Sequence, residues 1–128
     1  MNGSGTILVV EDDPLVRRFM LTVLQRYGYR TLEAFDGSGG LTIFSHHKNA
    51  VDLVLSDVVM PHPGPEMVEE ILRLDPDARI GFMSGTAGMM YLLPDRLKSV
   101  PLLLKPFTCD CLLEFVQRCL HTGHQTVQ

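Results

Sequence analysis

Ile7-Leu8-Val9-Val10-Glu11-Asp12-Asp13 decides the fold class of this chain, because a short apolar run ends abruptly at three acidic residues. Three more runs share this pattern of an apolar stretch that stops at a polar residue: Val51 to Leu55 before Ser56-Asp57, Ile80 to Met83 before Ser84, and Leu102 to Leu104 before Lys105. Buried parallel strands read as continuous apolar runs, and open α/β sheets bind ligands beyond the carboxyl ends of their strands. We therefore expect the four polar stops to converge on one edge of a sheet.

Segments of helical period separate the apolar runs. Pro14 suits a first helical position, and apolar residues then recur at three- to four-residue spacing until Gly28, with Arg17 and Arg18 on the solvent face. Residues 30–34 predict a further strand, and residues 39–46, 66–74 and those following Thr108 predict helices. The stretch from Thr86 to Leu97 is poorly patterned, so we expect only a short helix there. Five β-α units in a row predict one parallel sheet with helices on both faces.

Length and composition fit one domain. The chain has 128 residues, 45% hydrophobic and 20% charged, and a formal net charge of -4 that argues against nucleic-acid binding. No apolar stretch approaches the roughly twenty residues that span a bilayer, and the N-terminus lacks signal-peptide features. The three cysteines suit reduced thiols of the cytosol. We expect a cytoplasmic domain over 1–128, with its core at about 6–120, flexible tails at 1–5 and 122–128, and no nucleic-acid or membrane partner.

Four short motifs, taken together, carry a resemblance to a known family. They are Val9-Val10-Glu11-Asp12-Asp13-Pro14, Asp57-Val58-Val59-Met60-Pro61, Met83-Ser84-Gly85 and Lys105-Pro106-Phe107. In this order and spacing they resemble the receiver domain of two-component response regulators, over about Thr6 to Leu120. The resemblance implies an α/β fold of the flavodoxin-like (βα)5 type, a doubly wound five-stranded parallel sheet of strand order 2-1-3-4-5.

The resemblance also implies roles for the residues at the strand ends. Asp57 would accept a phosphoryl group from a histidine kinase or phosphotransfer domain. Mg²⁺ would be held by Asp57, by Asp12 directly, by Glu11 through water, and by the backbone carbonyl of Val59, because hard oxygen ligands suit that ion. Lys105 and Ser84 would contact the phosphoryl oxygens, and the Lys105–Pro106 peptide bond would be cis. Val59 and Thr86 would influence the rate of dephosphorylation.

Simpler explanations stand beside these roles. The acids at 11–13 suit a helix N-terminus, and for Asp13, next to Pro14, capping is the better account. Asp57 alone would fit a turn, Ser84 a hydroxyl that satisfies local backbone, and Lys105 a solvated strand end. Their joint occurrence at four strand ends favours the functional interpretation.

Three departures from the family pattern affect the expected signalling. The His62–Pro65 loop is one residue shorter than usual, serine replaces the more frequent threonine at Ser84, and Leu102 stands where an aromatic residue is common. Without that aromatic switch, we expect the signal to pass through the segment Thr86–Leu97, whose Met89–Leu93 run is apolar, and to promote self-association through this segment and Leu102.

The sequence therefore predicts a phosphorylation-dependent signalling switch. It would catalyse its own phosphorylation and slow dephosphorylation, without acting as an enzyme on a separate metabolite, and it is either a stand-alone regulator or part of a hybrid histidine kinase. One alternative is a pseudo-receiver, a protein-interaction module without phosphotransfer. A flavodoxin-like cofactor binder is disfavoured, because no Gly-rich or Ser/Thr-rich phosphate loop follows Val10.

Overall fold

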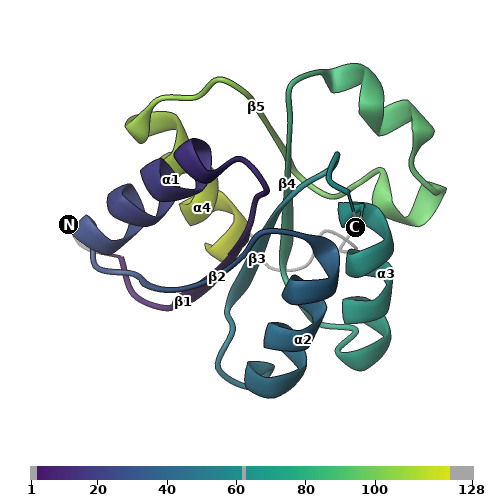
Figure 1. Ribbon diagram of the computed structural model, residues 1–128, viewed down its shortest axis with the longest axis horizontal. Coiled ribbons are helices and arrows are strands. Elements are labelled where there is room, and N and C mark those ends of the chain that lie inside the picture. Colours follow the sequence, from purple (N-terminus) through teal and green to yellow (C-terminus); the bar gives the residue numbers. More distant parts are fainter. Residues whose placement is uncertain (1–2, 62, 122–128) are drawn as a thin grey trace.

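The computed structural model describes residues 3–61 and 63–121 and contains one five-stranded parallel sheet of order β2-β1-β3-β4-β5 (Figure 1). Its strands are β1 (Thr6–Val10), β2 (Arg30–Ala34), β3 (Leu53–Asp57), β4 (Ile80–Ser84) and β5 (Leu102–Leu104). The α-helices are α1 (Pro14–Arg26), α2 (Gly37–His47), α3 (Gly64–Leu74) and α4 (Cys109–His121). The predicted fold class and strand order are confirmed. The described elements run from Thr6 to His121, and the expected tail at 122–128 lies outside the described residues.

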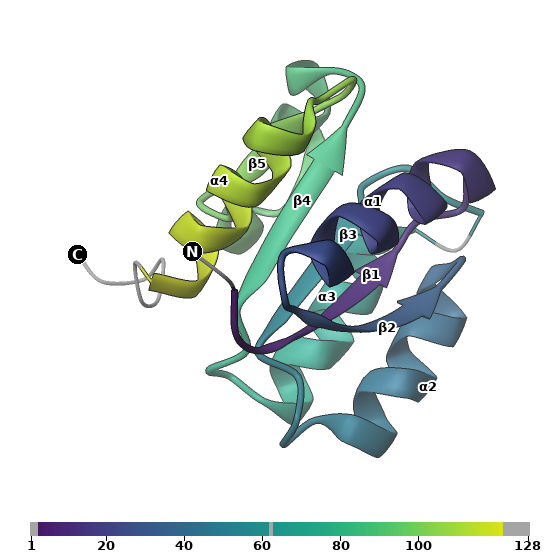
Figure 2. The same ribbon diagram turned by 90° about the vertical axis from the view of Figure 1, so that its left-hand side faces the viewer.

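Both faces of the sheet are covered, which explains why its inner strands β1, β3 and β4 carry apolar residues on both sides. Figure 2 shows α1 and α4 on one face and α2 and α3 on the other. Along β1, Leu8 and Val10 belong to the core beneath α2 and α3, while Ile7 and Val9 belong to the core beneath α1 and α4. Successive strand residues point to opposite faces, so a strand buried on both sides is apolar throughout.

The helix and strand ends differ slightly from the expected ones, and the differences affect the site. Strands β3 and β4 include Asp57 and Ser84 as their last residues. Helix α3 begins at Gly64, two residues earlier than predicted, with Pro65 in its first turn, where a fixed φ suits a helix start. Asp13 caps α1 by accepting hydrogen bonds from Leu15 N at 2.9 Å and Val16 N at 3.4 Å, as predicted.

The connection between β4 and β5 consists of two 3₁₀ helices, η1 (Ala87–Leu92) and η2 (Asp95–Leu97). The predicted short helix is therefore present but is neither regular nor continuous. Within the expected apolar run, Leu93 is buried and Tyr91 is 82% exposed. The side chains of Met89 and Leu92 lie outside the described part of the structure.

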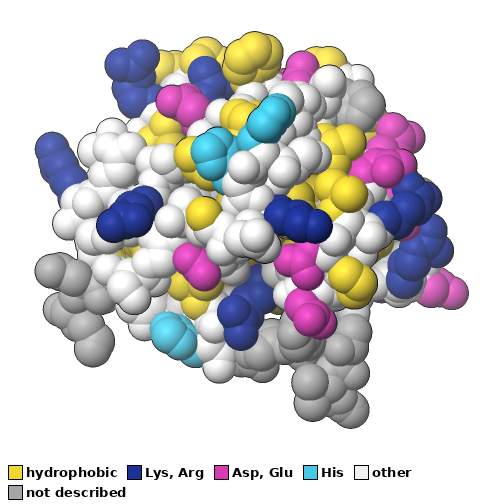
Figure 3. Space-filling view, turned by 90° about the horizontal axis from the view of Figure 1, so that it is seen from below, with side chains coloured by type: hydrophobic (Ala, Val, Ile, Leu, Met, Phe, Trp, Pro, Cys, Tyr) yellow, Lys and Arg dark blue, Asp and Glu magenta, His cyan; other side chains and the backbone are white. Residues whose placement is uncertain are grey.

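The surface is of mixed charge. In Figure 3 acidic and basic side chains are interspersed with apolar ones over the face seen from below. No helix among the described residues is long and apolar enough to cross a membrane.

Candidate functional site

Three carboxylates meet at the carboxyl edge of the sheet. Val10 pairs in register with Ser56, so Glu11, after β1, and Asp57, at the end of β3, are neighbours across adjacent strands. Asp12 joins them, and each of the three residues offers a carboxylate oxygen within 4.8 Å of the others. Glu11 is fully buried and Asp57 is buried, while Asp12 is exposed. The structure thus brings together the three acids that the strand-end pattern singled out.

Lys105, directly after β5, joins the same cluster. Its Nζ lies 2.7 Å from Glu11 Oε1 and 2.8 Å from Asp57 Oδ2, so one ammonium group bridges the two buried carboxylates. Its backbone N–H donates to the Ser84 carbonyl oxygen at 2.8 Å, which ties the residue to the end of β4. The Lys105–Pro106 peptide bond is cis.

The buried charges shift one another's protonation. Burial raises the pKa of the Glu11 carboxyl, and the charge on Asp57 adds to this, while hydrogen bonds from Lys105 and from the Asp13 N–H oppose it. Burial lowers the pKa of the Lys105 ammonium, but its hydrogen bonds and charge attraction to Asp57 and Glu11 outweigh burial and leave that pKa raised. Lys105 is therefore a firmly charged cation beside the acids.

The donor set suits a hard divalent cation. Three carboxylates outnumber one ammonium group, and oxygen is the ligand atom that Mg²⁺ prefers. Glu11 Oε1 is buried and pairs with Lys105 Nζ at 2.7 Å, which leaves part of its capacity to accept unmet among the described residues. A buried carboxylate oxygen without a full set of partners is costly, so these residues fit a bound cation.

The backbone around Asp57 is held by residues that sequence reasoning missed. Ser56 Oγ donates to the Asp57 carbonyl oxygen at 2.9 Å, and Gly64 N donates to the Val58 carbonyl oxygen at 3.3 Å. A Cβ atom on Gly64 would lie 2.1 Å from the Asp57 carbonyl oxygen, so the start of α3 presses directly against the strand end. A glycine after the Pro61 loop was the available signal, because close backbone approach requires glycine.

Ser84 lies at the end of β4 but its hydroxyl is engaged locally. Its Oγ donates to the Thr86 carbonyl oxygen at 2.9 Å and accepts from Thr86 N at 3.2 Å. The Thr86 hydroxyl in turn caps η1 by accepting from Gly88 N at 3.2 Å. The structure therefore shows the local-backbone arrangement for Ser84, and the expected contact to a phosphoryl group requires this hydroxyl to turn.

Val59 follows Asp57 and lies at the mouth of the site. Its N–H donates to Asp57 Oδ1 at 3.3 Å, and the residue is 57% exposed. Val59 thus presents apolar surface beside the acids, beyond the same carboxyl edge of the sheet as the exposed Thr86 that follows β4.

Arg17 corrects the prediction that it faces solvent. Its side chain is only 18% exposed, and its Nη1 donates to the Glu11 carbonyl oxygen at 2.8 Å. Its Nε pairs with Glu33 Oε1 at 3.1 Å, and its guanidinium lies 5.9 Å from the ring centre of Phe35. Arg17 therefore fixes the loop that carries the acidic pair to the neighbouring strand β2.

Comparison with known proteins agrees with this geometry. The family model described as the response regulator receiver domain matches residues 7–117. Sensor kinase CckA of Brucella abortus is 37% identical over 123 residues, which are 94% of this chain and 13% of CckA. The response regulator receiver protein CpdR of the same organism is 31% identical over 117 residues, 89% of this chain and 95% of CpdR.

A solved structure of a related protein resembles this chain in fold. The response regulator protein TrrA from Thermotoga maritima, in complex with Mg²⁺-BeF, superposes with a TM-score of 0.77 at 31% identity, over 91% of this chain and 99% of TrrA. The chain thus spans a small part of a sensor kinase and nearly all of a receiver protein. The family match over most of its length and these identities show that the chain belongs to the response regulator receiver domain family.

Proposed function

We propose that this receiver domain is a switch that is phosphorylated on Asp57 by a histidine kinase or a phosphotransfer domain. One observation carries the proposal: the buried Asp57 carboxylate is held by Lys105 at 2.8 Å and lies among the carboxylates of Glu11 and Asp12. A carboxylate oxygen of Asp57 would bond to phosphorus as the phosphorus–nitrogen bond of the donor phosphohistidine breaks, and the imidazole would take up a proton.

The neighbouring residues have distinct parts in this proposal. Glu11, Asp12, Asp57 and the Val59 carbonyl would hold Mg²⁺, which would supply positive charge to the phosphoryl oxygens. Lys105 is already in place as a fixed cation on the same carboxylate. The domain would thus catalyse its own phosphorylation from the donor, without acting on a separate metabolite.

The switch itself would begin at Ser84. Its hydroxyl would leave the Thr86 carbonyl, with which it bonds at 2.9 Å, and donate to the phosphoryl group. Because Thr86 caps η1, this change would reach the segment 86–97 directly. Tyr91, which is exposed there, supports the proposal that this segment and Leu102 mediate self-association. Sedimentation with and without beryllofluoride tests this, and an unchanged mass would contradict it.

An apolar surface beside Lys105 supports docking of the phosphoryl donor. Leu15 is 78% exposed, and Phe19 and Phe107 pack with ring centres 6.3 Å apart next to it. These residues line a depression of about 260 Å³ together with Lys105. Exposed apolar surface next to a reactive group suits a partner that must bring its own group close.

Because the donor kinase uses ATP, we place the domain in the cytoplasm.

The docking proposal separates two phosphorylation routes. Leu15→Glu should slow transfer from a phosphorylated phosphotransfer domain about tenfold, because it puts a charge into the contact surface, but leave labelling by acetyl phosphate unchanged. Leu74→Glu is the matched control, since Leu74 is 44% exposed at the far end of α3. Equal transfer rates for the two variants would refute this docking surface.

The phosphorylation site is tested by intact-mass measurement after incubation with acetyl phosphate and Mg²⁺. The wild type should gain one phosphoryl group and Asp57→Asn should gain none. Asp13→Asn should label normally, because asparagine also caps helices. A wild type that never labels would favour the pseudo-receiver alternative, and a labelled Asp57→Asn variant would show that the site lies elsewhere.

A further inference from the structure

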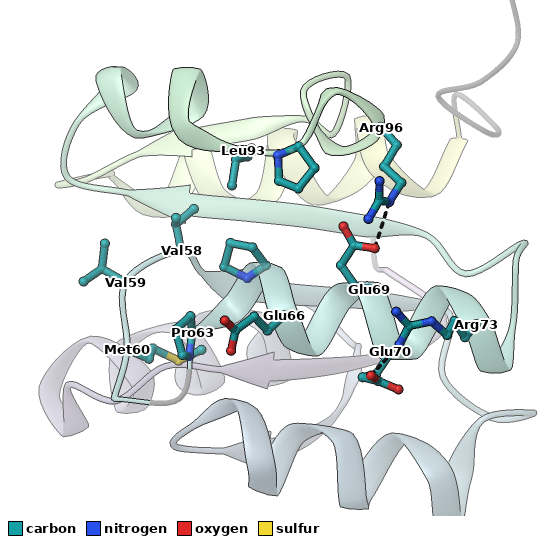
Figure 4. A pocket seen from close by; sticks show the side chains of 12 residues that line it. Val58, Val59, Met60, Pro63, Glu66, Glu69, Glu70, Arg73, Leu93 and Arg96 are labelled. Carbon is teal, nitrogen blue, oxygen red and sulfur yellow. Dashed lines mark hydrogen bonds and ion pairs between the residues drawn. The ribbon is translucent and has the colours of Figure 1, made fainter.

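An open groove of about 600 Å³ runs between α3 and the segment that holds η1 and η2 (Figure 4). One wall comes from the loop after Asp57 and from α3, and the other from residues 93–96. The groove is present where two short 3₁₀ helices, rather than one regular helix, connect β4 to β5. It is distinct from the acid cluster and from the depression beside Leu15.

The groove combines an apolar floor with an exposed apolar lip. Val58, Met60 and Leu93 are buried members of the core that reach its surface. Val59 stands at one end and is 57% exposed. A concave apolar floor of this volume matches a site for one or two large side chains.

The glutamates that line the groove differ in how fully their carboxylates are paired. Glu69 Oε1 on α3 pairs with Arg96 Nε at 2.8 Å, an ion pair that spans the two walls (Figure 4). Glu69 Oε2 is buried and has no hydrogen-bond partner among the described residues. Glu70 pairs with Arg73 along the helix, whereas Glu66 has no ion pair in the part of the chain that the structure describes. The α3 wall therefore retains unmet capacity to accept a cation.

We propose that this groove binds a segment of a partner protein in which a large apolar side chain adjoins a lysine or arginine. The apolar side chain would pack on Val58 and Leu93. The cation would pair with Glu66 and Glu69, displacing Arg96, whose side chain is 68% exposed. An acid in the first turn of α3 also complements the helix dipole, which explains Glu66 but not Glu69 one turn later.

The groove is present without a phosphoryl group on Asp57, so binding is tested on the unphosphorylated protein. The probes are two blocked dipeptides, acetyl-Phe-Arg-amide and acetyl-Phe-Glu-amide, titrated into the ¹⁵N-labelled domain. The arginine probe should shift the amide resonances of residues 58–60 and 93–96, and the glutamate probe should not. Glu66→Gln with Glu69→Gln should weaken the arginine probe about fivefold, the scale of a partly exposed ion pair.

Glu114→Gln is the matched control, because Glu114 is an exposed glutamate on α4, away from the groove. If the double variant does not fold, Glu66→Gln alone serves, since Glu66 is exposed and makes no ion pair with the residues at 3–61 and 63–121. Equal shifts with the two probes, or equal affinity of the double variant and the control, would overturn the proposal. Shifts of the groove resonances with protein concentration alone would assign the groove to a second copy of the chain and would also overturn it.

Discussion

Replacing Gly64 with alanine tests whether the start of α3 positions the phosphoacceptor. The added Cβ atom would lie 2.1 Å from the Asp57 carbonyl oxygen and 2.7 Å from Ser56 Oγ. Carbon–oxygen contacts in proteins lie at about 3.3 Å or more, so α3 or the end of β3 must move by roughly 1 Å. The obstacle is backbone rather than a flexible side chain, so it cannot give way easily.

The sign of the change in unfolding free energy shows whether overpacking or helix propensity dominates in the Gly64→Ala variant. Gly64 is helical, and the positive-φ glycines of the structure are Gly5 and Gly28, so alanine fits the Gly64 backbone. On helix propensity alone alanine would stabilise the protein by about 0.5–1 kcal/mol. Overpacking against backbone costs about 3 kcal/mol at the upper end of its usual range. We therefore expect a net loss of about 2 kcal/mol, or roughly 6 °C in Tm for a domain of this size.

The rate of phosphorylation should fall by a larger factor than the stability of the fold. Misplacing a reacting group by about 1 Å can lower a reaction rate on the order of a hundredfold. The assays are thermal unfolding and the rate of labelling by acetyl phosphate. Gly85→Ala is the control, since a Cβ atom there meets no atom within 4 Å, and its Tm should not fall. If Gly64→Ala melts and labels like the wild type, the close contact does not position Asp57.

Three other predictions concern the acids, the lifetime of the phosphoryl group and the thiols. Asp12→Ala should abolish Mg²⁺-dependent labelling without lowering Tm, because it removes repulsion; unchanged Mg²⁺ affinity would contradict this. Val59→Asn with Thr86→Glu should speed phosphate release up to about tenfold, about 1.4 kcal/mol of barrier, by orienting a water; equal rates at saturating Mg²⁺ would refute it. Burial raises the pKa of Cys119 to about 11, so at pH 8 a thiol reagent should modify the two exposed cysteines of the folded protein and all three after unfolding, as mass spectrometry can show.

The sheet and the location of the acids could be predicted from the sequence because they depend on simple periodicity. A strand buried on both faces is apolar without alternation, as β1 is from Ile7 to Val10 and β3 from Leu53 to Leu55, so each run ends visibly where the chain reaches the carboxyl edge. The register that sets Glu11 beside Asp57 follows once β1 and β3 are adjacent. That adjacency came from the family resemblance, because apolar runs alone do not order the strands.

What the sequence did not predict is which of several possible hydrogen-bond partners a polar side chain takes in the folded protein. Arg17 looked like a solvated residue of an amphipathic helix, yet it bonds to the Glu11 carbonyl and to Glu33. The hydroxyl of Ser84 was expected to face the phosphoryl group, but in this state a nearer acceptor, the Thr86 carbonyl, holds it. Such choices among hydrogen-bond partners depend on local geometry that residue spacing does not encode.

The groove and the phosphorylation site share two segments of backbone, which has a thermodynamic consequence. One groove wall includes Val58 and Met60, directly after Asp57, and the other belongs to the segment that begins at Thr86, held by Ser84. If phosphorylation moves these segments, it changes the distance between the walls. A ligand that prefers one distance must then change the phosphorylation equilibrium by the same factor by which phosphorylation changes its affinity. A partner seated in the groove would therefore act on the phosphoryl state of Asp57 without touching the acid cluster.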